Sequence, residues 1–139
     1  MKRSVLIITA ALSSLALSGC VDRQQADAKL DLGCQAVAMA VLPEGQTVEI
    51  KSAEHTPSTE APGQRHVTLH AITKDGWAET ETTYDCVFDE QFGFLSSSYT
   101  ASFYSLKFND QIYGQSGSEI LGGPEVISKI TDALRKVFY

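Results

Sequence analysis

The chain has 139 residues, which is enough for one domain, and it carries 11 basic and 17 acidic side chains. Its net charge of −6 disfavours nucleic acid and other polyanions as partners, because the mean field of an acidic protein repels them. The same field would attract a basic protein. We therefore expect no nucleic-acid partner.

The first 20 residues have the layout of an export signal. Residues 1–3 are a basic start, residues 5–16 are mostly apolar, and small residues precede Cys20. The apolar segment is shorter than the roughly 20 residues that a helix needs to cross a bilayer. We expect residues 1–19 to be a signal peptide that is removed, and not a permanent membrane span.

Leu17, Ser18, Gly19 and Cys20 each occupy an expected position of the lipobox, and the segment resembles the signal of bacterial lipoproteins. The resemblance covers residues 1–20 only. It implies a diacylglyceryl thioether on Cys20, cleavage before Cys20, and acylation of the new amine. Buried CH₂ groups contribute about 0.8 kcal/mol each, so two or three acyl chains would hold the protein on a lipid bilayer without a span.

The resemblance also indicates a location. Val21 follows Cys20, whereas enterobacterial lipoproteins retained in the inner membrane have Asp there, and Asp22 lies one place later. This implies a lipid-anchored protein of the cell envelope, in the outer membrane and facing the periplasm. Without the two basic residues of the signal, residues 20–139 carry 9 basic and 17 acidic side chains, a net charge of −8.

The three cysteines separate into one lipidation site and one pair. With Cys20 acylated, Cys34 and Cys86 remain, and in an oxidising compartment they are expected to form a disulfide. Closing a loop of about 50 residues contributes roughly 3–4 kcal/mol to stability on the chain-entropy model. A redox function would instead favour closely spaced cysteines such as C-x-x-C.

The mature chain begins with a polar stretch at residues 20–28, which we interpret as a lipidated tether before a single periplasmic domain at residues 29–139. Apolar residues at three- and four-residue steps, among them Leu30, Cys34 and Val37, predict a helix over about 25–41. The turn residues at 43–45 end it.

Four strands are predicted after that helix, at residues 47–51, 65–73, 77–89 and 99–109. Residues 52–64 are polar and contain two prolines, which is typical of a mobile surface loop. Asp75-Gly76 between two strand-like runs predicts a hairpin. Alternation along the third strand places Tyr84, Cys86 and Phe88 on one face, toward the helix that carries Cys34.

The fourth strand has apolar residues on both faces, with Phe103 on one and Leu106 on the other, which predicts a strand covered on both sides. The second cover would be a helix over about 124–138, which has Pro124 near its start and one apolar stripe. The expected fold class is α+β: an N-terminal helix, about four antiparallel strands, a C-terminal helix and one helix-to-sheet disulfide.

Residues suited to catalysis or metal binding are few. His66 and His70 would lie about 13 Å apart on one strand face, too far to share an ion, and His55 falls in the predicted loop. Ser96–Ser98 lack a nucleophile-elbow context. Glu79 and Glu81 would face solvent on one strand. We expect no catalytic residue, no metal site and no cofactor.

The one segment with binding potential carries aromatic rings beside Gly93 and a serine run. Its candidate patch consists of Phe92, Phe94, Tyr99 and Tyr104. Tyrosine is favoured at interfaces, but the same rings could complete the core of a small domain. The sequence leaves both interpretations open.

The leading functional hypothesis is a non-enzymatic, membrane-anchored periplasmic binding or accessory domain with an envelope protein as partner. A first alternative is a self-protection lipoprotein (immunity, exclusion or lytic-enzyme inhibition) that captures a basic effector by electrostatic steering. A second is a cell-wall hydrolase that uses the carboxylates of Glu79 and Glu81.

Overall fold

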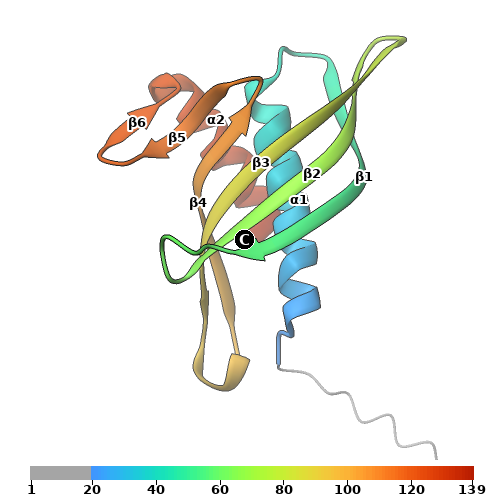
Figure 1. The fold of residues 1–139 in the computed structure, drawn as a ribbon. Coiled ribbons are helices and arrows are strands. Elements are labelled where there is room, and N and C mark those ends of the chain that lie inside the picture. The colour runs from blue at the N-terminus through green and yellow to red at the C-terminus, as the bar shows by residue number, and fades with distance from the viewer. Residues whose placement is uncertain (1–19) are drawn as a thin grey trace, which may run out of the picture.

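The computed structural model describes residues 20–139 as two helices, six strands and one 3₁₀ turn (Figure 1). The elements are α1 Arg23–Val41, β1 Gln46–Pro57, β2 Gln64–Asp75, β3 Ala78–Phe92, η1 Phe94–Ser96, β4 Tyr99–Phe108, β5 Gln111–Ser116, β6 Glu119–Leu121 and α2 Gly123–Phe138. The α+β class is confirmed, with six strands in place of about four. The predicted signal at residues 1–19 lies outside the described residues. Within the described part, no helix is long and apolar enough to cross a membrane.

The six strands form one antiparallel meander, in the order β1-β2-β3-β4-β5-β6. The predicted hairpin at Asp75-Gly76 is confirmed: Asp75 pairs with Ala78, and Gly76 and Trp77 form the loop. Gly76 adopts φ +62°, a left-handed conformation that glycine reaches without a Cβ clash.

Both helices pack on the same face of the sheet, and the core lies between them and the strands (Figure 1). Leu30 of α1 and Ile130 of α2 belong to one buried cluster with the sheet residues Leu69, Tyr84 and Leu106. The expectation that the C-terminal helix covers a second sheet face is therefore wrong. The opposite side, called the open face below, carries polar side chains such as His66 and His70.

A β-bulge in β4 explains that error. Val87 pairs with Ser105 and Phe88 with Phe103, so Tyr104 is an extra residue without a partner on β3. The bulge shifts the alternation by one residue, and both Phe103 and Leu106 consequently face the helices. Phe103 and Leu106 would lie on opposite faces of a straight strand, but they lie on one face of the bulged β4.

The predicted loop at residues 52–64 is wrong over most of its length, because β1 continues past a second bulge. The pairing of β1 with β2 shifts between Ile50 and Ser52 and then continues to Pro57, so only residues 58–63 connect the two strands. Beyond the bulge at Lys51, Ala53 and His55 turn toward the helix side. The hydrogen-bonded ladder with β2 outweighs the polar composition of this segment.

The short strands β5 and β6 were not predicted, because their apolar residues do not alternate over enough positions. Gly114 shows why the pairing with β4 is close. It has φ +96°, and a Cβ added there would lie 2.4 Å from the Tyr104 carbonyl oxygen. Only glycine fits this position, although a glycine in a sequence usually argues against a strand.

The expected tether at residues 20–28 is also shorter than predicted, because α1 begins at Arg23. Asp22 is the N-cap and its carboxylate accepts a hydrogen bond from the Gln25 backbone N–H at 2.7 Å, while the Gln25 side chain accepts one from the Asp22 N–H at 3.3 Å. Ala26 is already fully buried. Only residues 20–22 therefore separate the predicted cleavage site from a packed helix.

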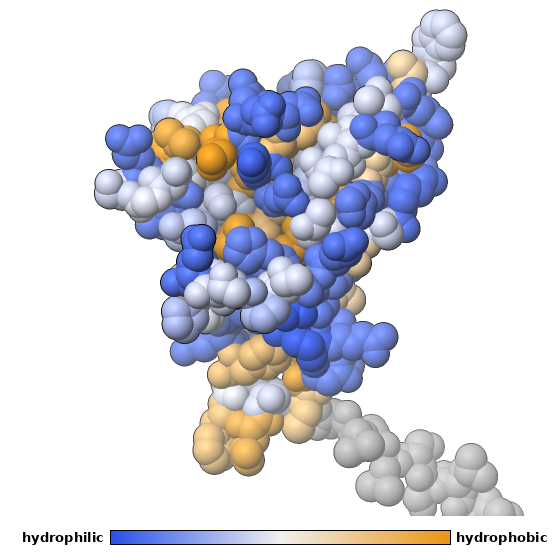
Figure 2. Space-filling model, in the orientation of Figure 1, coloured by the Kyte–Doolittle hydropathy of each residue, from blue (hydrophilic) through white to orange (hydrophobic). Residues whose placement is uncertain are grey.

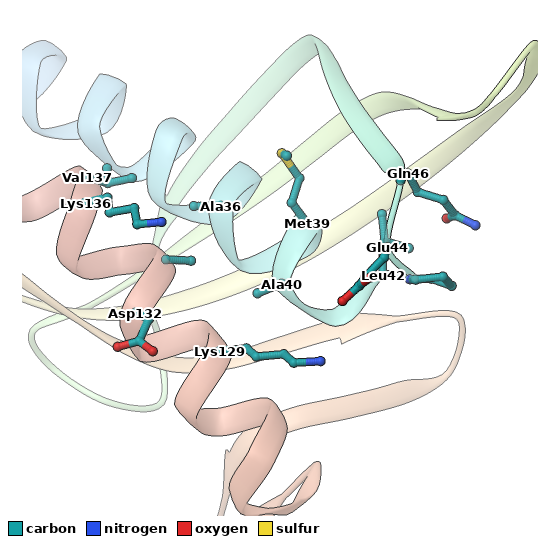
Figure 3. Close-up of a pocket in the computed structure, with 13 residues that line it drawn as sticks. Ala36, Met39, Ala40, Leu42, Glu44, Gln46, Lys129, Asp132, Lys136 and Val137 are labelled. Carbon is teal, nitrogen blue, oxygen red and sulfur yellow. The ribbon is translucent and has the colours of Figure 1, made fainter.

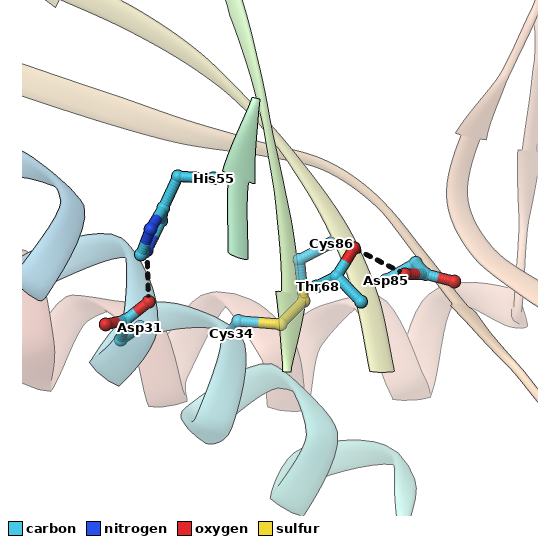
Figure 4. Close-up of a disulfide and its surroundings, with 6 residues drawn as sticks. All are labelled: Asp31, Cys34, His55, Thr68, Asp85 and Cys86. Atoms are coloured by element: carbon cyan, nitrogen blue, oxygen red, sulfur yellow. Dashed lines mark hydrogen bonds and ion pairs between the residues drawn. A yellow bond between two sulfur atoms is a disulfide. The ribbon is translucent and has the colours of Figure 1, made fainter. Parts of the chain in front are cut away.

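The predicted disulfide is confirmed (Figure 4). Cys34 in the middle of α1 is bonded to Cys86 in the middle of β3, with a Cα–Cα distance of 5.8 Å. Both cysteines are fully buried, and Tyr84 and Phe88 flank Cys86 on the same face, as the alternation predicts. The bond ties the first helix to the strand that runs the length of the sheet.

Candidate functional site

Cys20 is exposed and lies against the connection between β3 and β4. Its Sγ lies 3.7 Å from the carbonyl oxygen of Leu95, and the Val21 N–H donates a hydrogen bond to the Ser96 carbonyl oxygen at 2.9 Å. Acylation of the thiol would remove the first of these interactions and leave the second. The backbone next to the predicted lipidation site is thus attached to the folded domain.

The β3–β4 tip, defined as residues 92–99, is a narrow hairpin end with two outward-pointing apolar side chains. Phe94 is 86% exposed and Leu95 is 77% exposed. Leu95 and Ser96 have φ values of +51° and +56°, which is the left-handed region that L-residues with a side chain rarely occupy. The Gly93 N–H donates to the Ser98 carbonyl oxygen at 2.8 Å and closes the turn.

Figure 2 shows the consequence for the surface. Hydrophobic side chains cover the lower end of the domain, at the β3–β4 tip and beside the point where the described chain begins, whereas hydrophilic side chains dominate just above them. The apolar tip and Cys20 therefore form one continuous end of the molecule.

The four residues of the predicted aromatic patch divide between different surroundings. Phe92, Phe94 and Tyr99 lie at the β3–β4 tip, where Tyr99 is half-buried and its ring packs at a tilt against that of Phe92, with ring centres 5.0 Å apart. Tyr104 lies farther along β4 at the bulge. The structure therefore brings together three of the four predicted rings, without Tyr104, and adds the aliphatic side chain of Leu95.

An ion pair supports the base of this hairpin. Both Nη atoms of Arg23 donate to the Glu90 carboxylate, at 2.6 and 2.8 Å, and the Tyr99 hydroxyl donates to Glu90 Oε2 at 3.0 Å. The Arg23 guanidinium also lies 5.2 Å from the centre of the Phe92 ring, within cation–π range. Arg23 thereby joins the first turn of α1 to β3, and Glu90 in turn joins β3 to Tyr99 of β4.

A second cluster extends the network along α1. Arg65 donates two hydrogen bonds to the Asp27 carboxylate, at 3.0 and 2.8 Å, and Arg23 lies 2.8 Å from the same carboxylate. His55 Nε2 lies 2.6 Å from Asp31 Oδ1 (Figure 4). These side chains are mostly buried between α1 and the ends of β1 and β2.

The electrostatics of the network follow from burial and from its charges. Burial raises the pKa of Asp27, but the hydrogen bond from Arg65 and the nearby cationic groups outweigh it and leave that pKa below its ordinary value. For Asp31, burial outweighs the His55 hydrogen bond and raises the pKa. Burial, followed by the negative charge of Glu90, raises the pKa of Tyr99.

Sequence reasoning missed this network. The partners lie far apart in the chain, 67 residues for Arg23 and Glu90 and 38 for Asp27 and Arg65. Only the charges of Arg23 and Asp27, four residues apart on a helix, gave a local signal. His55 was placed in a loop and in fact lies on β1 beside Asp31.

The other candidate residues lie apart from this end. Glu79 and Glu81 are exposed on β3, and Glu79 Oε1 lies 3.6 Å from Lys74 Nζ. His66 and His70 lie on one face of β2, as predicted, and both are exposed on the open face. Among residues 20–139, no group of three or more histidine, cysteine or acidic side chains is arranged to hold a metal ion.

A groove of about 560 Å³ lies between the C-terminal half of α1 and α2 (Figure 3). Its floor is made of small side chains, and Met39, half-exposed, stands at its edge. The charged residues at its rim are Glu44, Lys129, Asp132 and Lys136. Since the helix runs away from Cys20, this groove lies at the other end of α1.

Comparison with protein-family models, with curated proteins and with solved structures finds no match for this chain.

Proposed function

We propose that this chain is a lipoprotein anchored to the membrane through acylated Cys20, with a non-enzymatic binding or accessory domain in the periplasm. The position of Cys20 is the observation that carries this proposal. Cys20 is exposed, lies at one end of the domain and precedes the N-cap residue Asp22 by only two positions. An acyl group there would leave the core undisturbed and set the domain directly on the bilayer.

The rest of the domain is then oriented away from the membrane. The 19 residues of α1 extend about 28 Å at 1.5 Å per residue. The groove beside Met39 lies toward the far end of this helix, and the β2–β3 hairpin with Trp77 also lies away from the β3–β4 tip (Figure 1). Trp77 is 98% exposed. These are the surfaces that a periplasmic partner would reach.

The groove favours a protein segment as the bound group. Its small floor residues admit an apolar side chain, and its rim offers both carboxylates and ammonium groups for polar pairing. A partner in the envelope that is bound here would be held at a set distance from the bilayer. Anchoring thus restricts which part of a neighbouring protein the domain meets.

A photocrosslinking amino acid placed at Met39 in intact cells tests the partner surface. We expect an adduct with an envelope protein from this position. Leu32 is the matched control, because it is also exposed on α1 but lies two turns nearer Cys20 and outside the groove. No adduct from Met39, or equal adducts from both positions, would contradict a partner in the groove. Separation of inner and outer membranes from the same cells tests the location.

The open face supports the self-protection alternative as a second candidate. It carries the acidic residues Glu49, Glu54, Glu79, Glu81, Asp85 and Asp89 against Lys51, Lys74 and Lys107. Such a surface would steer a basic effector toward it. We expect binding of a basic muramidase to weaken with salt and with Glu81→Lys, whereas Glu125→Lys on α2 should leave it unchanged. Equal loss in both variants would remove the support from this candidate.

A further inference from the structure

We infer that the β3–β4 tip is a second membrane contact, in which Phe94 and Leu95 enter the interfacial region of the same phospholipid bilayer that holds Cys20. This inference rests on the proposed lipidation of Cys20 and goes beyond it. Acyl chains alone would leave the domain free to tilt on the bilayer surface, whereas two contacts would fix its orientation.

The distance between anchor and tip is the first argument. Cys20 Sγ lies 3.7 Å from the Leu95 carbonyl oxygen, and the Val21 N–H is bonded to the carbonyl oxygen of Ser96. Acyl chains leaving that sulfur must enter the bilayer beside the hairpin. An apolar tip held this close to the anchor therefore reaches the lipid surface without any rearrangement of the domain.

The chemistry of the tip suits the interface. Phe94 and Leu95 are the two apolar side chains most exposed near the anchor. Phenylalanine and leucine are also the residues with which interfacial helices enter the boundary between headgroups and acyl chains, to a depth of about 5–10 Å. Residues 91–106 contain no acidic, basic or histidine side chain, in a mature chain of net charge −8. Insertion of the tip therefore desolvates no charge.

The charged groups nearest the tip are arranged so that they need not enter the bilayer. Glu90, just behind the tip, is bonded to Arg23 and Tyr99. The Asp22 carboxylate accepts the hydrogen bond of the helix cap and lies on the domain side of Val21. These groups would lie at the level of the headgroups, where they keep access to water.

The backbone of the tip supplies an independent argument. Leu95 and Ser96 are both in the left-handed region, although neither is glycine. A fold that needed only a turn here would favour glycine or asparagine, which adopt that conformation with little strain. Such strain at an exposed apolar residue is typical of a functional segment. The Phe92 and Tyr99 rings pack against each other across the hairpin, directly behind this turn.

The protein offers its own fluorescence control, because Trp77 is its one tryptophan and lies on the hairpin far from the tip. The probe is Phe94→Trp combined with Trp77→Phe, in the lipidated protein reconstituted into phosphatidylcholine vesicles with brominated acyl chains. We expect a blue-shifted emission and quenching roughly threefold or more above that of wild-type Trp77. Ile120→Trp in the same background, on exposed β6, should behave like Trp77.

Flotation of the vesicles separates the two proposals. If the protein does not float with the lipid, the anchor at Cys20 fails. If it floats and the tryptophan at position 94 is no more quenched than Trp77, the anchor stands and the tip contact is overturned. The tryptophan emission could instead shift to the blue without quenching by the lipid, and only when vesicles hold more than one copy of the protein on average. That result would show that the tip packs on a second copy, and it would also overturn the inference.

Discussion

The two hairpins at the ends of β3 present apolar side chains in different ways. The β2–β3 hairpin turns through Gly76 at φ +62° and leaves Trp77 98% exposed. The β3–β4 tip turns through Leu95 and Ser96, both at positive φ, and leaves Phe94 and Leu95 exposed beside Cys20. The first turn has glycine at the position with positive φ. The second has leucine there, although positive φ is unfavourable for leucine.

The contrast separates folding from function. At Gly76 the residue type follows from the φ angle alone, so the turn could be predicted. Leu95 adopts a positive φ angle that leucine rarely occupies, and its exposed side chain lies beside Cys20, the proposed lipidation site. A local rule that is broken next to Cys20 and kept at the other end indicates a function for the tip.

The largest effect is expected from removal of the Cys34–Cys86 disulfide, which joins β3, the strand shared by both hairpins, to α1. Replacing Cys34 or Cys86 by alanine should lower the free energy of unfolding by about 4 kcal/mol, because the disulfide closes a loop of 52 residues in the unfolded chain. Urea unfolding of each single variant measures the loss, which should be similar for the two. Equal unfolding of the wild type with and without reductant would contradict this role.

The next effect distinguishes the two ends of β3. Glu90→Gln should lower the free energy of unfolding by about 2 kcal/mol, because the mostly buried Glu90 then loses its charge and its bidentate pairing with the partly exposed Arg23. Glu79→Gln, the control at the other end of the strand, removes an exposed partner of Lys74 and should change stability by less than about 0.5 kcal/mol. Similar losses in both variants would show that the Arg23–Glu90 pair is no stronger than a surface pair.

A matched pair of substitutions tests the turns themselves. Leu95→Gly should raise the free energy of unfolding by about 0.5–1 kcal/mol through relief of the left-handed backbone, and Gly76→Ala should lower it by a similar amount. Chemical unfolding of the purified protein in detergent measures both. If Leu95→Gly destabilises, the leucine has a structural role at the tip and the contrast between the hairpins fails.

The smallest effect depends on pH. Burial and the charge of Glu90 raise the pKa of Tyr99 above its ordinary value of 10, so its neutral form stabilises the fold below pH 10. That contribution is lost as pH rises through the folded-state pKa. Tyr99→Phe should therefore reduce the fall in melting temperature above pH 10. Tyr104→Phe is the control; an identical fall in all three proteins would exclude Tyr99 as a cause.

Local patterns were enough to predict part of the fold. Apolar residues at three- and four-residue steps located α1 and α2, and the alternation at Tyr84, Cys86 and Phe88 identified the strand face that meets Cys34. These features depend on residues within a few positions of one another. The two bulges do not, because Lys51 and Tyr104 are left without partners only once a neighbouring strand fixes the register.

The site was less predictable than the fold. Cys20 and the rings of Phe92 and Phe94 stood out by residue type, but their proximity follows from the path of the sheet. The ion pairs that support the tip join segments 38 and 67 residues apart, and no single-sequence pattern specifies such pairs. That Leu95 is exposed, with a positive φ angle, follows only from the structure.

The mass of the N-terminal peptide of the protein, purified from membranes of cells that produce it, tests the central claim most directly. We predict a peptide that begins at Cys20 and carries a diacylglyceryl group on the sulfur, with or without an acyl group on the amine. A mature protein that retains residues 1–19, or one that begins at an unmodified Cys20, would contradict the account.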